Sequence, residues 1–178
     1  IWEAIDTASG GAIREGSVGA GTGTRAFGWK GGIGTSSRQL PDRFGGYTVG
    51  VLVQSNYGGV LTIDGVPIGK ELQRYSYAPS VADKGNDSGS ASFDNLGDGS
   101  CMLVVATDAP VDARDLKRIA TRAVFGLART GSSYSNGSGD FAIAFSTSQE
   151  MRSTFGDRNP RKRSILQPDG VSPLFQAT

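Results

Sequence analysis

Three runs of apolar residues predict the strands of a buried sheet. They are residues 47–54 (YTVGVLVQ), Ser100–Thr107 and residues 141–147 (FAIAFST). Short continuous runs rich in β-branched residues are typical of strands that are buried on both faces. The pattern predicts a fourth strand at residues 60–68 (VLTIDGVPI), bent around Asp64 and Gly65.

Helical periodicity is clearest in residues 111–130, directly after Pro110. Apolar residues there fall on one helical face, with Arg and Lys opposite; they are Leu116, Ile119, Ala120, Ala123 and Leu127. Asp112, three residues before Asp115, resembles an N-terminal cap. A second, shorter helix is expected at residues 1–9, ended by Gly10 and Gly11. Strands outnumber helices, so the pattern predicts an α+β sandwich whose helices cover the outer faces of sheets.

The segment 16–38 is rich in glycine and could be mistaken for a phosphate-binding loop. It lacks the Gly-Lys-Ser/Thr of a P-loop and does not lie between a strand and a helix, as a dinucleotide fingerprint must. We interpret it as tight turns and close backbone approaches. Its larger apolar residues are expected to pack inward; they are Val18, Phe27, Trp29 and Ile33.

Polar loops separate these elements. Asn86–Gly99 (NDSGSASFDNLGDG) is typical of a mobile loop, and residues 131–140 form a second Gly- and Ser-rich turn. The run Arg158–Arg163 is expected to be a solvated loop, with a role at a substrate entrance as the alternative. Ser100 stands where the first loop meets a strand. It is either a structural serine at a strand start or a nucleophile that self-processing turns into a new N-terminus.

The composition excludes several classes of function. The chain has 178 residues, 37% of them hydrophobic, which is enough for one domain with a core. Its net charge of +1 lacks the charge density of a nucleic-acid or membrane-surface binder, and no window has the roughly 18 apolar residues of a membrane span. The chain starts at Ile1 without methionine and looks cut at both ends, so its compartment stays undecided.

Histidine is absent and Cys101 is the single cysteine. The first absence removes the Ser-His-Asp triad, the Cys-His dyad and almost every catalytic zinc site. A single cysteine excludes an intrachain disulfide and does not indicate whether the protein's compartment is oxidising or reducing. Acyl-transfer chemistry here would need a carboxylate, a lysine or an α-amine as its general base.

Candidate polar residues stand at the ends of the predicted strands. Asn56 follows one strand, while Ser138 and Asp140 precede another. Each alone is common in turns, but a hydroxyl nucleophile without histidine needs an activator, and a free α-amine on the same residue can provide it. Such an amine has an ordinary pKa of about 7.7–8.0. Breaking the Gly99–Ser100 bond would create it, and glycine tolerates the distorted backbone of an N→O acyl shift.

Several stretches together resemble the self-cleaving DmpA/BapA group of L-aminopeptidase/D-esterases and β-peptidyl aminopeptidases. The central ones are GSCMLVVATDAP, FGLARTGS and YSNGSGDFAIAFST. The upstream ones are EGSVGAGTGT, KGGIGTSSR and YTVGVLVQSNYG. The resemblance covers nearly the whole chain.

The resemblance implies a role for each candidate residue. Ser100 matches the nucleophile that autocleavage exposes, and Asn56 matches the asparagine that donates to the developing oxyanion. Ser138 and Asp140 match the hydroxyl and the acidic residue that orient the nucleophile and its amine. Some relatives carry Glu at the acidic position, so the shorter Asp140 must reach further or act through a water. Cys101 stands where relatives usually carry an aliphatic residue; it is a small buried hydrophobe or a competing thiol.

The resemblance also implies an αββα sandwich like that of N-terminal-nucleophile hydrolases and close to that of ornithine acetyltransferases. It implies no metal or organic cofactor, and assembly of processed heterodimers into oligomers. Relatives have a further N-terminal region and continue past Thr178. Residues 1–178 are therefore expected to be a fragment of one catalytic domain, cleaved into 1–99 of an α chain and 100–178 of a β chain, with the remaining segments of the same protein as partners.

The leading functional hypothesis is a self-cleaving serine aminopeptidase that releases N-terminal residues, β- or D-residues included, from peptides, amino-acid amides or esters. An acyltransferase of the ornithine acetyltransferase type is the alternative, but those relatives cleave before threonine, so Ser100 argues against it. A non-catalytic ligand-binding homologue is the third hypothesis. The joint presence of Ser100, Asn56, Ser138 and Asp140 argues against this one. No nucleic-acid or membrane partner is expected.

Overall fold

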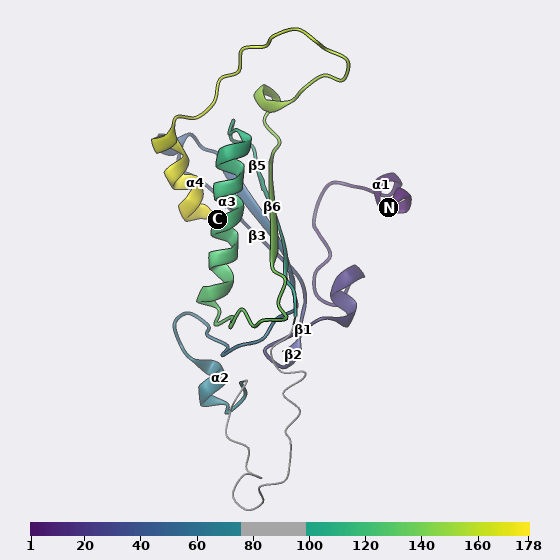
Figure 1. Ribbon diagram of the computed structural model, residues 1–178, viewed down its shortest axis with the longest axis vertical. Helices are drawn as coiled ribbons and strands as arrows, with labels where there is room; N and C mark the ends of the chain where they lie inside the picture. The colour runs from purple at the N-terminus through teal and green to yellow at the C-terminus, as the bar shows by residue number, and fades with distance from the viewer. Residues whose placement is uncertain (76–98) are drawn as a thin grey trace, which may run out of the picture.

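A mixed four-stranded sheet forms the centre of the molecule (Figure 1). The computed structural model describes residues 1–75 and 99–178. The strand order is β3-β4-β5-β6, with β3 antiparallel to β4, β4 antiparallel to β5, and β5 parallel to β6. These strands are β3 (Gly32–Gln39), β4 (Thr48–Ser55), β5 (Met102–Thr107) and β6 (Phe141–Ser146).

Helix α3 (Ala113–Arg129) connects the parallel strands β5 and β6 and covers one face of the sheet. Its start is capped as expected, since the Asp112 carboxylate accepts a hydrogen bond of 2.9 Å from the Asp115 backbone N–H. Helix α4 (Ser172–Ala177) packs beside α3 on the same face. The core lies between this helical layer and the sheet; its largest fully buried side chains are Val49, Cys101, Val105, Val111, Ile119, Val171 and Leu174.

Short elements complete the described chain. They are α1 (Trp2–Asp6), η1 (Gly19–Gly23), β1 (Arg25–Ala26), β2 (Trp29–Lys30), η2 (Asp42–Phe44), α2 (Ile68–Glu71), η5 (Gln149–Met151) and η6 (Pro168–Val171). Strands β1 and β2 pair as a small antiparallel hairpin. None of the helices in residues 1–75 and 99–178 has the length and hydropathy of a membrane span.

The second face of the sheet is apolar over β5 and β6, and its larger side chains are exposed. Met102, Phe141, Ile143 and Phe145 are 42%, 60%, 59% and 46% exposed there. The expectation that β5 and β6 are buried on both faces is therefore wrong for this chain taken alone. Their continuous apolar runs reflect two apolar faces, but the helical layer covers only one of them.

Other expectations were partly wrong. Residues 60–68 form no strand beyond an isolated bridge between Ile63 and Val66, because Asp64 and Gly65 form a tight turn with positive φ. Strand β3 occupies the last part of the glycine-rich segment interpreted as turns and extends one residue past it. Of the predicted loop Asn86–Gly99, only Gly99 lies within the described residues. The basic run Arg158–Arg163 is exposed, as expected.

Candidate active site

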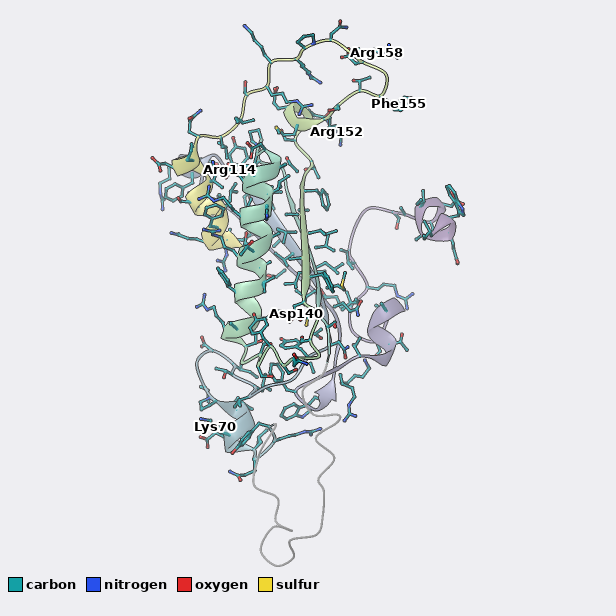
Figure 2. All side chains as sticks on the ribbon, in the orientation of Figure 1. Lys70, Arg114, Asp140, Arg152, Phe155 and Arg158 are labelled. Atoms are coloured by element: carbon teal, nitrogen blue, oxygen red, sulfur yellow. The ribbon has the colours of Figure 1, made fainter. Side chains whose placement is uncertain are left out.

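The sheet topology gathers the candidate residues at one edge. Because β4 runs antiparallel to β5 while β6 runs parallel to it, the end of β4 meets the starts of β5 and β6. Asn56 directly follows β4, Ser100 stands two residues before β5, and Asp140 directly precedes β6. Figure 2 shows Asp140 near the lower end of β6 and Arg158 in the loop at the top of the molecule. That separation disfavours a role for the basic run at the entrance to this site.

Ser100 is half-buried, and its hydroxyl is held by the turn that precedes β6. The Ser100 Oγ accepts a hydrogen bond of 3.0 Å from the Gly139 backbone N–H. The two strands are joined just beyond this point, where the Phe141 N–H donates to the Cys101 carbonyl over 2.9 Å. A Cβ on Gly139 would lie 3.3 Å from the Ser100 Oγ, so the absence of a side chain permits this close approach.

Asp140 connects the same two segments through both oxygens of its carboxylate. Its Oδ1 accepts a hydrogen bond of 3.0 Å from the Cys101 backbone N–H, and its Oδ2 accepts one of 2.9 Å from the Ser138 hydroxyl. The aspartate thus reaches the residue after Ser100 without an intervening water. The structure brings Ser138 to Asp140, as the sequence predicts, and Asp140 to the backbone next to Ser100.

Asn56 lies next to Gly99, the residue that precedes Ser100. Its Oδ1 accepts a hydrogen bond of 3.1 Å from the Arg25 backbone N–H, which fixes the orientation of the carboxamide. The following residue, Tyr57, is buried and pairs with the same segment, since its N–H donates to the Arg25 carbonyl over 3.1 Å. With Oδ1 occupied, the Nδ2 amide is the branch of Asn56 that remains to donate to another group.

Gly99 packs directly against Asn56. A Cβ built on Gly99 would lie 2.2 Å from the Asn56 carbonyl oxygen. Any other residue at this position would therefore force the backbone apart. The structure thus places Ser138 and Asp140 on the segment that contacts Ser100 and Cys101, and the backbone of Asn56 against Gly99.

Comparison with protein families identifies the chain. Residues 1–178, its full length, match the family model described as peptidase family S58. The chain belongs to this peptidase family. The resemblance noted from the sequence motifs is confirmed.

Among curated proteins, a β-peptidyl aminopeptidase BapA of Sphingosinicella microcystinivorans is 46% identical over 178 residues. A second one, from Sphingosinicella xenopeptidilytica, is also 46% identical, over 179 residues. The alignments cover 98% and 99% of this chain but 44% of each relative. The chain therefore spans less than half the length of the curated S58 relatives it matches.

Solved structures share the fold. A β-aminopeptidase of a Burkholderia species matches with a TM-score of 0.77 and 34% identity, over 99% of this chain and 46% of that one. The L-aminopeptidase D-Ala-esterase/amidase of Ochrobactrum anthropi, described as a variant among the Ntn-hydrolase fold, matches with a TM-score of 0.72 and 33% identity, over 99% and 44%. The expected α+β fold of N-terminal-nucleophile-hydrolase type is confirmed, and the described residues supply one sheet and one helical layer of it.

Cys101 is the buried hydrophobe that the sequence suggested. Its side chain is 0% exposed, and burial raises the pKa of its thiol to about 11, although a hydrogen bond with the Asn56 backbone acts in the opposite direction. The thiolate is the nucleophilic form of cysteine. At neutral pH Cys101 is thus a neutral thiol packed in the core behind Ser100.

Sequence reasoning missed Gly139, Arg25 and Lys30, which contact the cluster or support it. Gly139 and Arg25 act through backbone N–H groups, which every residue except proline carries, so no residue type signals them. The position of Gly139 between Ser138 and Asp140 was the available hint. Lys30 acts through three contacts with backbone carbonyls, which no local sequence pattern signals.

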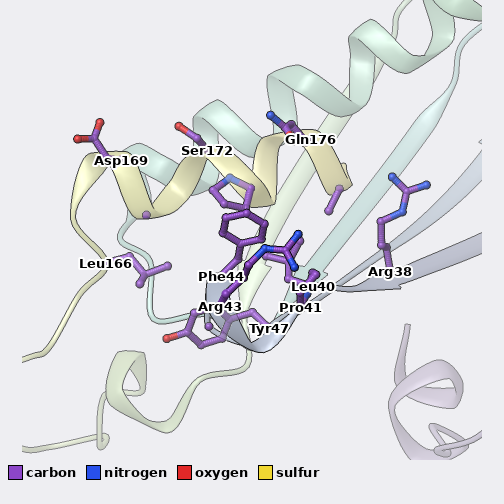
Figure 3. Close-up of a pocket in the computed structure, with 14 residues that line it drawn as sticks. Arg38, Leu40, Pro41, Arg43, Phe44, Tyr47, Leu166, Asp169, Ser172 and Gln176 are labelled. Atoms are coloured by element: carbon purple, nitrogen blue, oxygen red, sulfur yellow. The ribbon is translucent and has the colours of Figure 1, made fainter.

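Two cavities of the described chain lie away from this cluster. One of about 630 Å³ lies at the opposite edge of the sheet, where β3 ends and β4 begins (Figure 3). Its wall includes Arg38, Phe44, Tyr47, Leu166 and Gln176, and none of the candidate residues. Among the residues that the structure covers, no group of three or more His, Cys, Asp and Glu side chains could hold a metal ion.

Proposed function

We propose that this chain is the central part of a serine aminopeptidase that cleaves itself between Gly99 and Ser100 and then releases N-terminal residues from peptides, amino-acid amides or esters. The observation that carries the proposal is the cluster of Ser100, Asp140 and Asn56 around that bond. Family membership supports it, as do the names of the relatives. The two β-peptidyl aminopeptidases among them support β-residues as part of the substrate range.

Self-cleavage begins with the Ser100 hydroxyl. Its oxygen attacks the Gly99 carbonyl carbon, the C–N bond breaks, and the hydroxyl proton ends on the departing nitrogen, which leaves an ester between Gly99 and Ser100. Water then hydrolyses the ester, giving a Gly99 carboxylate and restoring the Ser100 hydroxyl next to a free α-amine. As the Ser100 hydroxyl loses its proton, the Gly139 N–H, 3.0 Å from the Oγ, stabilises the negative charge on this oxygen. The oxyanion of the attack forms on the Gly99 carbonyl oxygen.

Substrate hydrolysis uses the new amine as its general base. The α-amine of Ser100 takes the proton of its own hydroxyl, directly or through Ser138, as that oxygen attacks the substrate carbonyl. Asp140, fixed by Cys101 and Ser138, stabilises the ammonium that forms. Asn56 donates from Nδ2 to the oxyanion. The leaving amine or alcohol takes up the proton, and water releases the acyl group from Ser100.

The rest of the protein completes the domain. The apolar outer face of β5 and β6 needs a cover, and an exposed apolar surface of this kind marks an interaction site. The remaining segments of the same protein supply that cover as the second sheet of an αββα sandwich. The curated relatives are more than twice as long as this chain, which provides the length needed. The mature protein is then an oligomer of heterodimers whose α and β chains contain residues 1–99 and 100–178.

Steady-state kinetics of the full-length protein on an aminoacyl p-nitroanilide test the function. Wild-type protein is expected to turn the substrate over, while Ser100→Ala neither matures nor hydrolyses it. Ser132→Ala, at a serine outside the cluster, is the matched control and should mature normally. Near-normal turnover in Ser100→Ala would remove this residue from the mechanism and contradict the proposal.

A further inference from the structure

Lys30 lies at the end of β2, and its ammonium group donates hydrogen bonds to backbone carbonyls. Its Nζ donates to the carbonyl oxygens of Gly21 at 2.6 Å, Thr24 at 3.1 Å and Gly31 at 2.7 Å. An ammonium has three N–H donors, so these contacts use all of them. In the described part of the chain, Lys30 forms no ion pair with a carboxylate. A charged group placed among carbonyls in this way ties separate backbone segments together.

The three carbonyls flank the segment that orients Asn56. Gly21 lies in η1 and Thr24 directly follows η1, where carbonyl groups lack helical partners. Thr24 also receives a hydrogen bond of 3.0 Å from the Gly31 N–H. The next residue is Arg25, whose N–H donates to the Asn56 Oδ1. Lys30 therefore holds the chain on both sides of the hairpin that presents this N–H.

Close packing fixes that hairpin against the end of β4. A Cβ on Gly31 would lie 2.4 Å from the Ser55 carbonyl oxygen and 3.0 Å from the Arg25 nitrogen. Ser55 immediately precedes Asn56. With so little space, the position of the Arg25 N–H relative to Asn56 depends on the backbone that the lysine holds.

We propose that Lys30 is a positioning residue for Asn56, an inference that rests on the oxyanion role proposed above for this asparagine. Lys30 fixes the hairpin, the Arg25 N–H then fixes Oδ1, and Nδ2 stays directed to the site of the developing oxyanion. Without the ammonium, the carboxamide gains freedom to rotate and donates less well. An interaction used only in the transition state affects kcat and leaves KM nearly unchanged.

A double-mutant cycle in the mature full-length protein tests this role. Removing an oxyanion donor costs on the order of 10²–10³ in kcat, and Lys30→Met should lose part of this, about tenfold. On the Asn56→Ala background, Lys30→Met should change kcat by less than about twofold, since the residue through which it acts is gone. Lys117→Met, an exposed lysine on α3, is the control and should leave kcat at the wild-type value.

The outcomes separate the two proposals. Asn56→Ala with wild-type kcat contradicts the proposed oxyanion role itself. A normal loss in Asn56→Ala combined with no loss in Lys30→Met, or with an equal loss on both backgrounds, overturns only the positioning role. If Lys30→Met does not mature, Lys30→Arg goes through the same cycle, because it keeps the charge but not the geometry of the three contacts. A loss of kcat in Lys30→Arg that disappears on the Asn56→Ala background supports the role. No loss of kcat in Lys30→Arg, or an equal loss on both backgrounds, overturns it.

Discussion

Gly99 lies so close to Asn56 that a Cβ on the glycine would fall 2.2 Å from the asparagine's carbonyl oxygen. Real Cβ atoms essentially never come within 3.0 Å of another heavy atom. The residue on the acyl side of the proposed cleavage bond is thus packed against the residue proposed to stabilise the oxyanion. This contact links maturation and catalysis in one small region.

Gly99→Ala should slow self-cleavage. The added methyl group forces the Gly99 backbone away from Asn56 and from the attacking hydroxyl, and overpacking of this kind costs about 1–3 kcal/mol. A loss of that size in the transition state corresponds to a rate roughly 5–150 times lower. The measurement is the appearance of the two chains on a denaturing gel after synthesis.

Gly126→Ala is the matched control for this experiment. Gly126 lies in α3 with nothing within 4 Å of an added Cβ, and alanine favours a helix over glycine. This variant should mature at the wild-type rate. Wild-type maturation of Gly99→Ala as well would show that the close contact does not matter for cleavage.

Asn56→Ala should mainly lower kcat, by about 10²–10³, because it removes one oxyanion donor. KM should change little, since the donor acts most strongly on the charged transition state. Steady-state kinetics on matured protein measure both constants. A raised KM with unchanged kcat would assign Asn56 to substrate binding instead.

The sequence predicted the candidate site better than the sheet around it. Ser100, Asn56, Ser138 and Asp140 stand at the ends of apolar runs, so their convergence followed from the strands. Strand β3 was missed because its residues, GIGTSSRQ, have small or polar side chains and no apolar run. Eight residues of β3 pair with β4, and this pairing makes the segment a strand. A local sequence pattern does not encode such pairing between separate segments.

The outer face of the sheet illustrates a different limit. The apolar residues of β6 correctly indicated a strand with two apolar faces, but not which partner covers each face. Arg25 was missed because it contributes a backbone N–H, which no residue type signals. Lys30 was missed because its three hydrogen-bond acceptors are backbone carbonyls, which come close to it only in the folded chain. Such contacts become visible only once the chain is folded.

Asp140→Asn should change the pH dependence of hydrolysis. The general base must be neutral to act, so kcat/KM of the wild type rises with pH through an amine-like ionisation. A nearby carboxylate stabilises the ammonium and raises the pKa of the amine, so removing its charge lowers the apparent pKa and moves the rise to lower pH. The maximal rate should also fall, on the order of tenfold or more, because the ammonium loses its partner.

The readout is a pH profile of kcat/KM for both proteins. The bond that is cut should be the same in the variant. A profile that is flat from acidic to alkaline pH in the wild type would contradict an amine base. So would full activity after selective acetylation of the new N-terminus, verified by mass.

Cys101→Ala should retain maturation and activity within about threefold. The thiol is fully buried and its pKa is raised to about 11 by burial, so at pH 8 only on the order of 10⁻³ of it is thiolate. For the same reason iodoacetamide should leave folded wild-type protein unlabelled at pH 8 and label it after denaturation. Rapid labelling with loss of activity in the folded protein would show that the thiol is accessible and reactive.

The most direct test of the central claim is the intact mass of the purified full-length protein, combined with N-terminal sequencing. The account predicts two chains, with Ser-Cys-Met-Leu as the start of the second one, from cleavage between Gly99 and Ser100. Ser100→Ala should give one uncleaved chain under the same conditions. An active protein in which the Gly99–Ser100 bond is intact would contradict the account.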